Sequence, residues 1–211
     1  MLRHKALFAF LFFAALVWPL SSATLNFMVV ETGPPRESPS GDGPPAVFES
    51  SALWEDCLLD LFFEAGHIVS NSPILRLAGL SAADFPGSNR PAGNFPPEIL
   101  PEMEAAALGG ADYLILALLV YPPGAAGPKA KPEEVNLRVY SFSSREGPGL
   151  EEGPFTCRLV YEGGAPLNPS PEAPPEGNRP GGPAWGEEGG KEIERDRAKR
   201  LIRGLVPHIK D

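Results

Sequence analysis

The sequence predicts one three-layer α/β domain: a mixed sheet of about five strands, three parallel plus an antiparallel hairpin, with three main helices. Segments with helical periodicity alternate with short apolar runs, as in strands connected by helices. The runs at 25–31 and 112–121 are apolar on both faces, which is typical of strands covered on both sides. Two later runs alternate apolar and polar residues, which predicts the hairpin.

The helix expected at 52–65 organises the fold. Its apolar residues recur at spacings of three and four, namely Leu53, Trp54, Cys57, Leu58, Leu61, Phe62 and Ala65. Ser51 is the expected N-cap, and Gly66 can adopt the left-handed conformation that ends the helix. Because His67-Ile-Val follows at once, the chain is predicted to turn back as the second strand of a β-α-β unit.

A second helix is predicted at 98–108 and leads into the strand at 112–121. Right-handed crossovers then place the first strand between the second and the third, with the two helices on opposite faces of the sheet. A closing helix begins near Lys191 and ends at Pro207. Its expected apolar stripe is Ile193, Ala198, Leu201, Ile202, Leu205 and Val206.

The hairpin pairs a strand through Val135, Leu137 and Val139 with one that runs from Phe155 to Tyr161. We expect it antiparallel beside the third strand, with its outer edge facing solvent. Residues 33–45 and 162–190 are rich in Pro and Gly, and they are predicted to be disordered loops within the single domain 24–211.

Residues 1–23 have the pattern of a signal peptide. Arg3 and Lys5 precede an apolar run over 6–17, and small residues end at Ala23, the expected cleavage site. The run is shorter than the roughly 20 residues of a spanning helix. An uncleaved membrane anchor is the alternative reading. We expect an exported, periplasmic or envelope-associated protein that begins at Thr24.

The mature chain is expected to be acidic. Cleavage removes two positive charges and no acid, so the net charge falls from −9 to −11. Such a charge repels phosphate backbones and anionic lipid surfaces. The composition therefore argues against nucleic-acid partners and against electrostatic membrane binding.

Two stretches resemble the small α/β domains of bacterial envelope proteins. In 58–71 a helix runs into Ala-Gly-His-Ile-Val, and in 106–121 Ala-Leu-Gly-Gly-Ala-Asp-Tyr-Leu-Ile enters a buried strand. Both are similar to the amino-terminal domain of the Tol translocation protein and the related domain of the curli-secretion lipoprotein. The resemblance implies an envelope assembly or binding role with envelope proteins as partners. The lipid-bearing cysteine, the pore-forming hairpins and the Tol propeller have no counterpart, so pore formation is not implied.

The sequence contains no recognisable catalytic motif and indicates no cofactor. His67 and His208 are read as structural side chains, and Asp112 as a turn or capping residue at the amino end of a strand. We therefore expect no catalytic, cofactor-binding or metal site and a protein that is not an enzyme.

Neither cysteines nor acids suggest a metal site. The spacing of Cys57 and Cys157 with the two histidines matches no zinc pattern. The acids Glu146, Glu151 and Glu152 lack the spacing of a calcium loop. A disulfide between the two cysteines is left open, and two buried free thiols are preferred.

The function expected from the sequence is protein binding in the cell envelope. The exposed hairpin or the Pro-rich loops are the expected binding surfaces. The alternative is a ligand-binding module or a hydrolase whose site has no recognisable motif.

Overall fold

The computed structural model of the chain describes residues 22–33, 47–86, 95–125, 128–144, 155–167 and 187–209. Its strands are β1 (Thr24–Gly33), β2 (Ile68–Asn71), β3 (Leu75–Ala78), β4 (Tyr113–Val120), β5 (Glu134–Ser144) and β6 (Phe155–Pro166). Its α-helices are α2 (Glu49–Glu64), α3 (Leu100–Leu108) and α4 (Glu187–Arg203), with short 3₁₀ turns at Ala82–Asp84 and Val206–His208.

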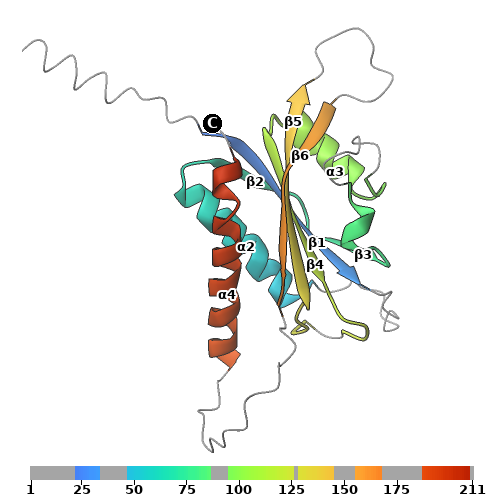
Figure 1. Cartoon of the computed structure of the whole chain (residues 1–211), viewed down its shortest axis with the longest axis vertical. Coiled ribbons are helices and arrows are strands. Elements are labelled where there is room, and N and C mark those ends of the chain that lie inside the picture. Colours follow the sequence, from blue (N-terminus) through green and yellow to red (C-terminus); the bar gives the residue numbers. More distant parts are fainter. Residues whose placement is uncertain are drawn as a thin grey trace, which may run out of the picture.

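The strands form one mixed sheet in the order β2-β1-β4-β5-β6, with β3 also beside β1 (Figure 1). Strand β1 pairs in parallel with β2, β3 and β4, whereas β4, β5 and β6 pair antiparallel. The α/β prediction, the place of the first strand and the position of the hairpin are therefore confirmed. The sheet has six strands rather than about five, and four of them are parallel.

Helices cover both faces of the sheet, as predicted. Helices α2 and α4 lie together on one face, and α3 lies on the other (Figure 1). Leu25, Phe27 and Val29 of β1 pack in the core on the α2 face, whereas Met28 and Val30 belong to the core on the α3 face. Successive residues of a strand point to opposite faces, so a central strand that serves two cores must be apolar throughout.

Helix α2 begins earlier than predicted, because a buried carboxylate holds its first turn. Glu31 Oε1 accepts a hydrogen bond from the backbone N of Phe48 at 2.9 Å, and the helix starts at the next residue. Ser51 is therefore not the N-cap. Its side chain is buried, and its Oγ lies 2.9 Å from the hydroxyl of Tyr121. Gly66 has a φ of 89° and follows the end of the helix, as expected.

The short strand β3 was not predicted, since four residues carry too little periodicity to distinguish a strand from a loop. Helix α3 starts two residues later than expected, with Pro101 in its first turn. The loop predicted at 162–190 is wrong at both ends: residues 162–166 continue β6, where they pair with β5, and α4 begins at Glu187. In the same way Gly33 belongs to β1.

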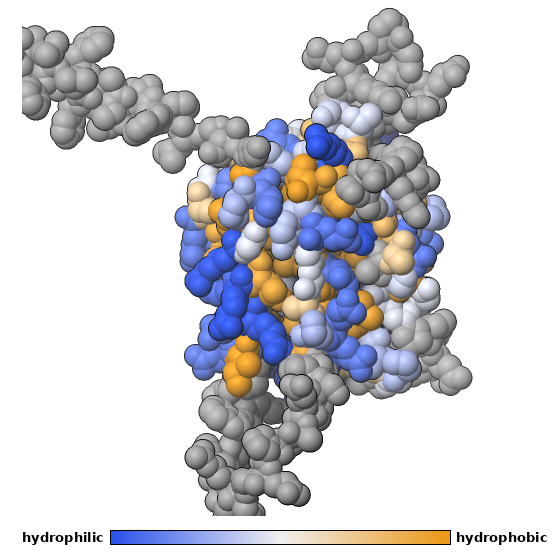
Figure 2. Space-filling view, in the orientation of Figure 1, coloured by the Kyte–Doolittle hydropathy of each residue, from blue (hydrophilic) through white to orange (hydrophobic). Residues whose placement is uncertain are grey.

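Helix α4 packs beside α2 through part of the predicted stripe. Ala198, Ile202 and Leu205 are buried, but Ile193 is 57% exposed and Val206 is 37% exposed. The outer side of α4 is charged, and Figure 2 shows hydrophilic side chains along this side of the molecule. An amphipathic helix of this kind contributes one apolar stripe to the core and leaves the rest of its surface in water.

Several predictions concern parts of the chain outside the described residues. These parts are residues 1–21 of the predicted signal peptide, 34–45 of the first predicted loop and 168–186 of the second. Within the described ranges, no helix combines the length and the apolarity needed to cross a bilayer.

Candidate functional site

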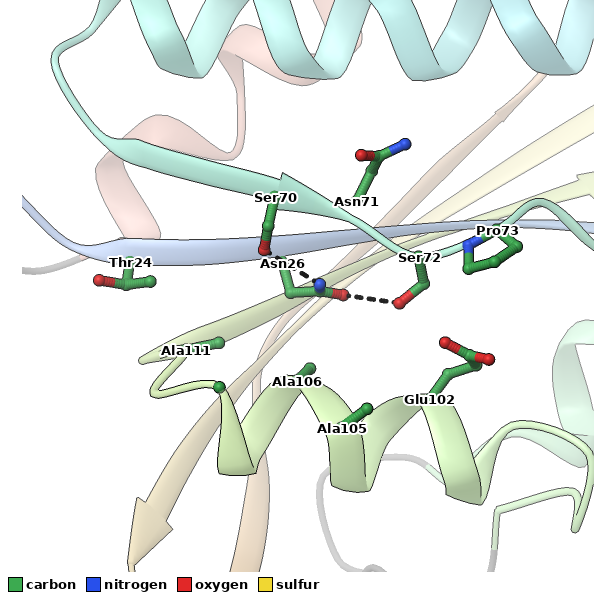
Figure 3. A pocket seen from close by; sticks show the side chains of 11 residues that line it. Thr24, Asn26, Ser70, Asn71, Ser72, Pro73, Glu102, Ala105, Ala106 and Ala111 are labelled. Carbon is green, nitrogen blue, oxygen red and sulfur yellow. Dashed lines mark hydrogen bonds between the residues drawn. The ribbon is translucent and has the colours of Figure 1, made fainter.

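A pocket with one polar wall lies between α3 and the edge of the sheet formed by β1 and β2 (Figure 3). Its volume is about 210 Å³. Its lining comes from the start of β1, the end of β2 and the inner side of α3, and consists of Thr24, Asn26, Ser70, Asn71, Ser72, Pro73, Glu102, Ala105, Ala106, Gly109 and Ala111. A space of this size accommodates one small group, such as the end of a side chain.

The hollow follows from the residues that face each other across it. Asn26 occupies a position on β1 that faces α3, two residues before the buried Met28. Opposite lie Ala105 and Ala106, whose side chains are too short to fill the gap (Figure 3). Gly109, also in the lining, has no side chain. Larger apolar residues on both sides would close the interior to normal packing density. Small and polar residues at these positions keep the space open.

Hydrogen bonds fix the polar wall of the pocket in place. Asn26 Nδ2 donates to Ser70 Oγ at 3.1 Å, and Ser72 Oγ donates to Asn26 Oδ1 at 3.2 Å (Figure 3). Ser70 Oγ in turn donates to the carbonyl of Leu25 at 3.3 Å. Asn26 is 7% exposed and Ser72 is 6% exposed. An amide oxygen and each hydroxyl oxygen have two lone pairs, so these groups can accept further hydrogen bonds.

The opposite wall carries a negative charge. Glu102 rises from α3 toward Ser72 and Pro73 (Figure 3), and its side chain is half-buried. The whole stretch 91–128 contains no Lys or Arg, and its charged residues are the acids Glu98, Glu102, Glu104 and Asp112. A cavity lined by a carboxylate and by hydroxyl and amide oxygens is suited to a cation that donates hydrogen bonds.

A second polar cluster lies at the carboxyl end of β1, where ligands often bind in parallel sheets. Glu31 Oε2 accepts from Arg76 Nε at 2.7 Å and lies 2.6 Å from Arg76 Nη2. The guanidinium is 5.0 Å from the ring centre of Phe48, whose backbone N the same carboxylate binds. Burial raises the pKa of the neighbouring Tyr121 hydroxyl. These contacts join the end of β1, β3 and the start of α2, so the cluster has a structural role.

The structure gives the predicted candidates separate roles. Asp112 Oδ2 accepts from the backbone N of Thr24 at 2.8 Å, a contact with the start of β1, 88 residues earlier in the chain. The ring of His67 lies 5.9 Å from that of Phe62, and the ring of His208 lies 4.5 Å from that of Tyr161. Within the described part of the chain, no hydrogen bond joins any two of these three candidates.

Both cysteines are free, as preferred from the sequence, but only Cys57 is buried as expected. Cys57 is buried between α2 and the sheet, and Cys157 is half-buried on the α3 face, so the sheet separates them. Burial raises the pKa of Cys57 and raises that of Cys157 to about 11.

Metal binding finds no support in the described ranges. Within them, no three His, Cys, Asp or Glu side chains gather as metal ligands would. The acids Glu146, Glu151 and Glu152 lie outside these ranges.

The pocket residues were not singled out from the sequence. The usable signal was Asn26, a polar residue within an otherwise apolar central strand, because such a position needs a polar partner. Its partners Ser70 and Ser72 come from a segment more than forty residues later, and nothing local connects them. No protein-family model matches the chain, and no curated protein matches it either.

Proposed function

We propose that the protein is an exported, non-enzymatic cell-envelope protein that binds a protein partner by receiving a lysine side chain in the pocket between α3 and β2. The observation that carries this proposal is the hydrogen-bonded row of Asn26, Ser70 and Ser72 facing the carboxylate of Glu102. An ammonium group donates three hydrogen bonds and accepts none. The acceptors of the row, together with the carboxylate, complement such a group.

The surroundings favour a cation carried on a flexible stem. Ala105, Ala106 and Gly109 supply an apolar wall for methylene groups, and the neighbouring acids attract positive charge. The volume of about 210 Å³ suits one side chain rather than a larger ligand. Lysine combines a compact charge with four flexible carbons, whereas arginine presents a broad planar fork.

Export and the envelope role rest on the signal-peptide pattern in residues 1–23 and on the resemblance to the small domains of Tol and curli-secretion proteins. The hairpin is less suited to binding than we expected from the sequence. Strand β6 is an edge strand of the described sheet, but its register with β5 shifts near Tyr140, and it carries Arg158, Glu162 and Pro166. Bulges, charges and proline are the devices by which edge strands avoid further pairing.

Binding can be measured with arrays of extended peptides, followed by calorimetric titration of the best binders into the mature protein. We expect peptides with a central lysine to bind, and acetylation of that lysine to abolish binding because it removes the charge. Glu102→Gln should weaken the affinity about tenfold, which corresponds to about 1.4 kcal/mol. Ala105→Leu, which fills the pocket, should weaken it further.

Glu104→Gln is the matched control, because Glu104 is an exposed acid on the same helix and does not line the pocket. It should leave binding unchanged. Equal affinity for lysine and acetyl-lysine peptides would refute the proposal, as would equal effects of the two glutamate variants.

The second candidate function is a module that binds a free small amine, and the same hydrogen-bond acceptors of the pocket favour it. It would gain support if butylamine bound as tightly as the peptides.

A further inference from the structure

We infer that cleavage between Ala23 and Thr24 creates an ion pair between the new α-ammonium group of Thr24 and the carboxylate of Asp112, which fixes the mature amino terminus at the rim of the pocket. This inference rests on the export proposed above. It assigns a role to Asp112, which belongs to no group of metal-ligating side chains among the residues that the structure describes.

Thr24 and Asp112 are already held together by two hydrogen bonds. The backbone N of Thr24 donates to Asp112 Oδ2 at 2.8 Å, and the backbone N of Asp112 donates to the carbonyl of Thr24 at 2.7 Å. From the other side, the backbone N of Phe142 donates to the carbonyl of Asp112 at 2.8 Å. The carboxylate is therefore positioned at the backbone nitrogen that processing would convert into the chain end.

Hydrolysis changes the charge at this nitrogen but not the strand pairing that follows it. Water adds across the Ala23–Thr24 peptide bond, the C–N bond breaks, the carboxylate leaves with Ala23, and the nitrogen of Thr24 becomes a protonated amine. The register of β1 with β2 and β4 begins at Thr24 and Leu25, so it remains intact. A neutral N–H donor thereby becomes a charged donor to a carboxylate, a bond roughly twice as strong.

Processing also removes the contacts of Ala23, whose side chain is buried in the core on the α2 face. The backbone N of Ile68 donates to the carbonyl of Ala23 at 3.1 Å, and this acceptor leaves with the cleaved peptide. Ile68 is 59% exposed and starts an edge strand, so water can replace the lost carbonyl. Thr24 lines the pocket, so the α-ammonium group that cleavage creates, paired with Asp112, lies at the rim of the pocket.

The test compares two chains, one that begins at Thr24 and one that begins at Ser22 and so keeps the peptide bond. Each is prepared with Asp112 and with Asp112→Asn, and thermal unfolding is measured for all four. We expect the substitution to lower the melting temperature of the chain from Thr24 by about 2–4 °C more than that of the longer chain. This excess should shrink in 1 M NaCl, because Asp112 is exposed and salt screens the pair.

A second readout is the rate at which an acylating reagent modifies the α-amino group, which Asp112→Asn should increase several-fold in the chain from Thr24. Equal melting-temperature losses in the two chains, with unchanged acylation, would overturn the ion pair while leaving export intact. Export itself is tested by amino-terminal sequencing of protein recovered from the envelope. A first residue other than Thr24 would overturn both the cleavage site and the ion pair.

Discussion

The two faces of the sheet are packed in different ways. The α2 face is covered by a helix of 16 residues that contributes Trp54, Leu58 and Phe62 to a continuous core. The α3 face is covered by a helix of nine residues, of which Met103 and Ala106 are buried. On that face Asn26 replaces a core residue of β1, and the pocket occupies the space that results.

Polar anchors also hold the α3 face, whose core has fewer buried residues than that of the α2 face. Arg138 Nη1 donates to the carbonyl of Phe85 at 2.9 Å, and the hydroxyl of Tyr140 donates to the carbonyl of Pro86 at 3.0 Å. Such bonds position a segment without filling volume, and each contributes on the order of 1 kcal/mol net. The comparison shows a larger apolar core on the α2 face and a smaller core beside a pocket on the α3 face.

The largest expected effect comes from truncating the aromatic core of the α2 face. Phe62 is fully buried, and its ring lies 5.5 Å from that of Phe27. We expect Phe62→Ala to lower the free energy of unfolding by about 3–5 kcal/mol, because it removes a large buried surface and leaves a cavity. Urea denaturation monitored by circular dichroism measures this change.

The next residue in the chain provides the control. Phe63 is 71% exposed, so Phe63→Ala should change the free energy of unfolding by less than about 0.5 kcal/mol. Met103→Ala on the α3 face should cost less than Phe62→Ala, because the methionine side chain is smaller and lies in the core with fewer buried residues. Equal costs on the two faces would contradict the proposed asymmetry.

A somewhat smaller effect is expected at the carboxylate that joins β1 to α2. Glu31 is 3% exposed and binds both Arg76 and the backbone of Phe48. Glu31→Gln should cost about 3 kcal/mol, because it leaves a partly buried guanidinium without its counter-charge. Glu49→Gln is the control, since its pair with Lys191 is exposed on both sides and is worth at most about 1 kcal/mol. Similar losses in the two variants would show that Glu31 does not organise this junction.

The smallest expected effect is that of a reducing agent. We expect it to leave the stability of the native protein unchanged. The sheet separates Cys57 from Cys157, whereas a disulfide closing about 100 residues would stabilise the fold by about 4–5 kcal/mol. Thiol titration of unfolded, unreduced protein should find two free thiols. A melting temperature that falls on reduction would contradict the separation of the two faces.

The two buried or half-buried thiols also predict that the free energy of unfolding decreases at alkaline pH. Burial raises the pKa of Cys157 to about 11 in the folded protein and also raises that of Cys57, whereas an unfolded thiol titrates near 8.5. As the pH rises, the unfolded chain loses its thiol protons first, so the stabilisation present below about pH 8.5 is lost progressively toward pH 11. Thermal unfolding between pH 8 and pH 11 measures this loss, and Cys157→Ser should reduce its slope.

Some features of the protein are determined by local sequence patterns. Runs that are apolar on both faces identified β1 and β4 as buried strands. Alternation with a period of two identified the hairpin, and Gly66 marked the end of α2. The order of these segments, with right-handed crossovers, was enough to place β1 inside the sheet. These inferences succeed because burial imposes a repeat that can be read within about ten residues.

Other features were decided only by tertiary contacts. The start of α2 depends on Glu31, 17 residues before the backbone N that it binds. The polar wall joins Asn26 to Ser72 across 46 residues, and Thr24 meets Asp112 across 88. No local sequence repeat predicts such pairings. A hydrogen bond between distant residues depends on where the folded chain brings the two groups together, and the sequence around each group does not show this.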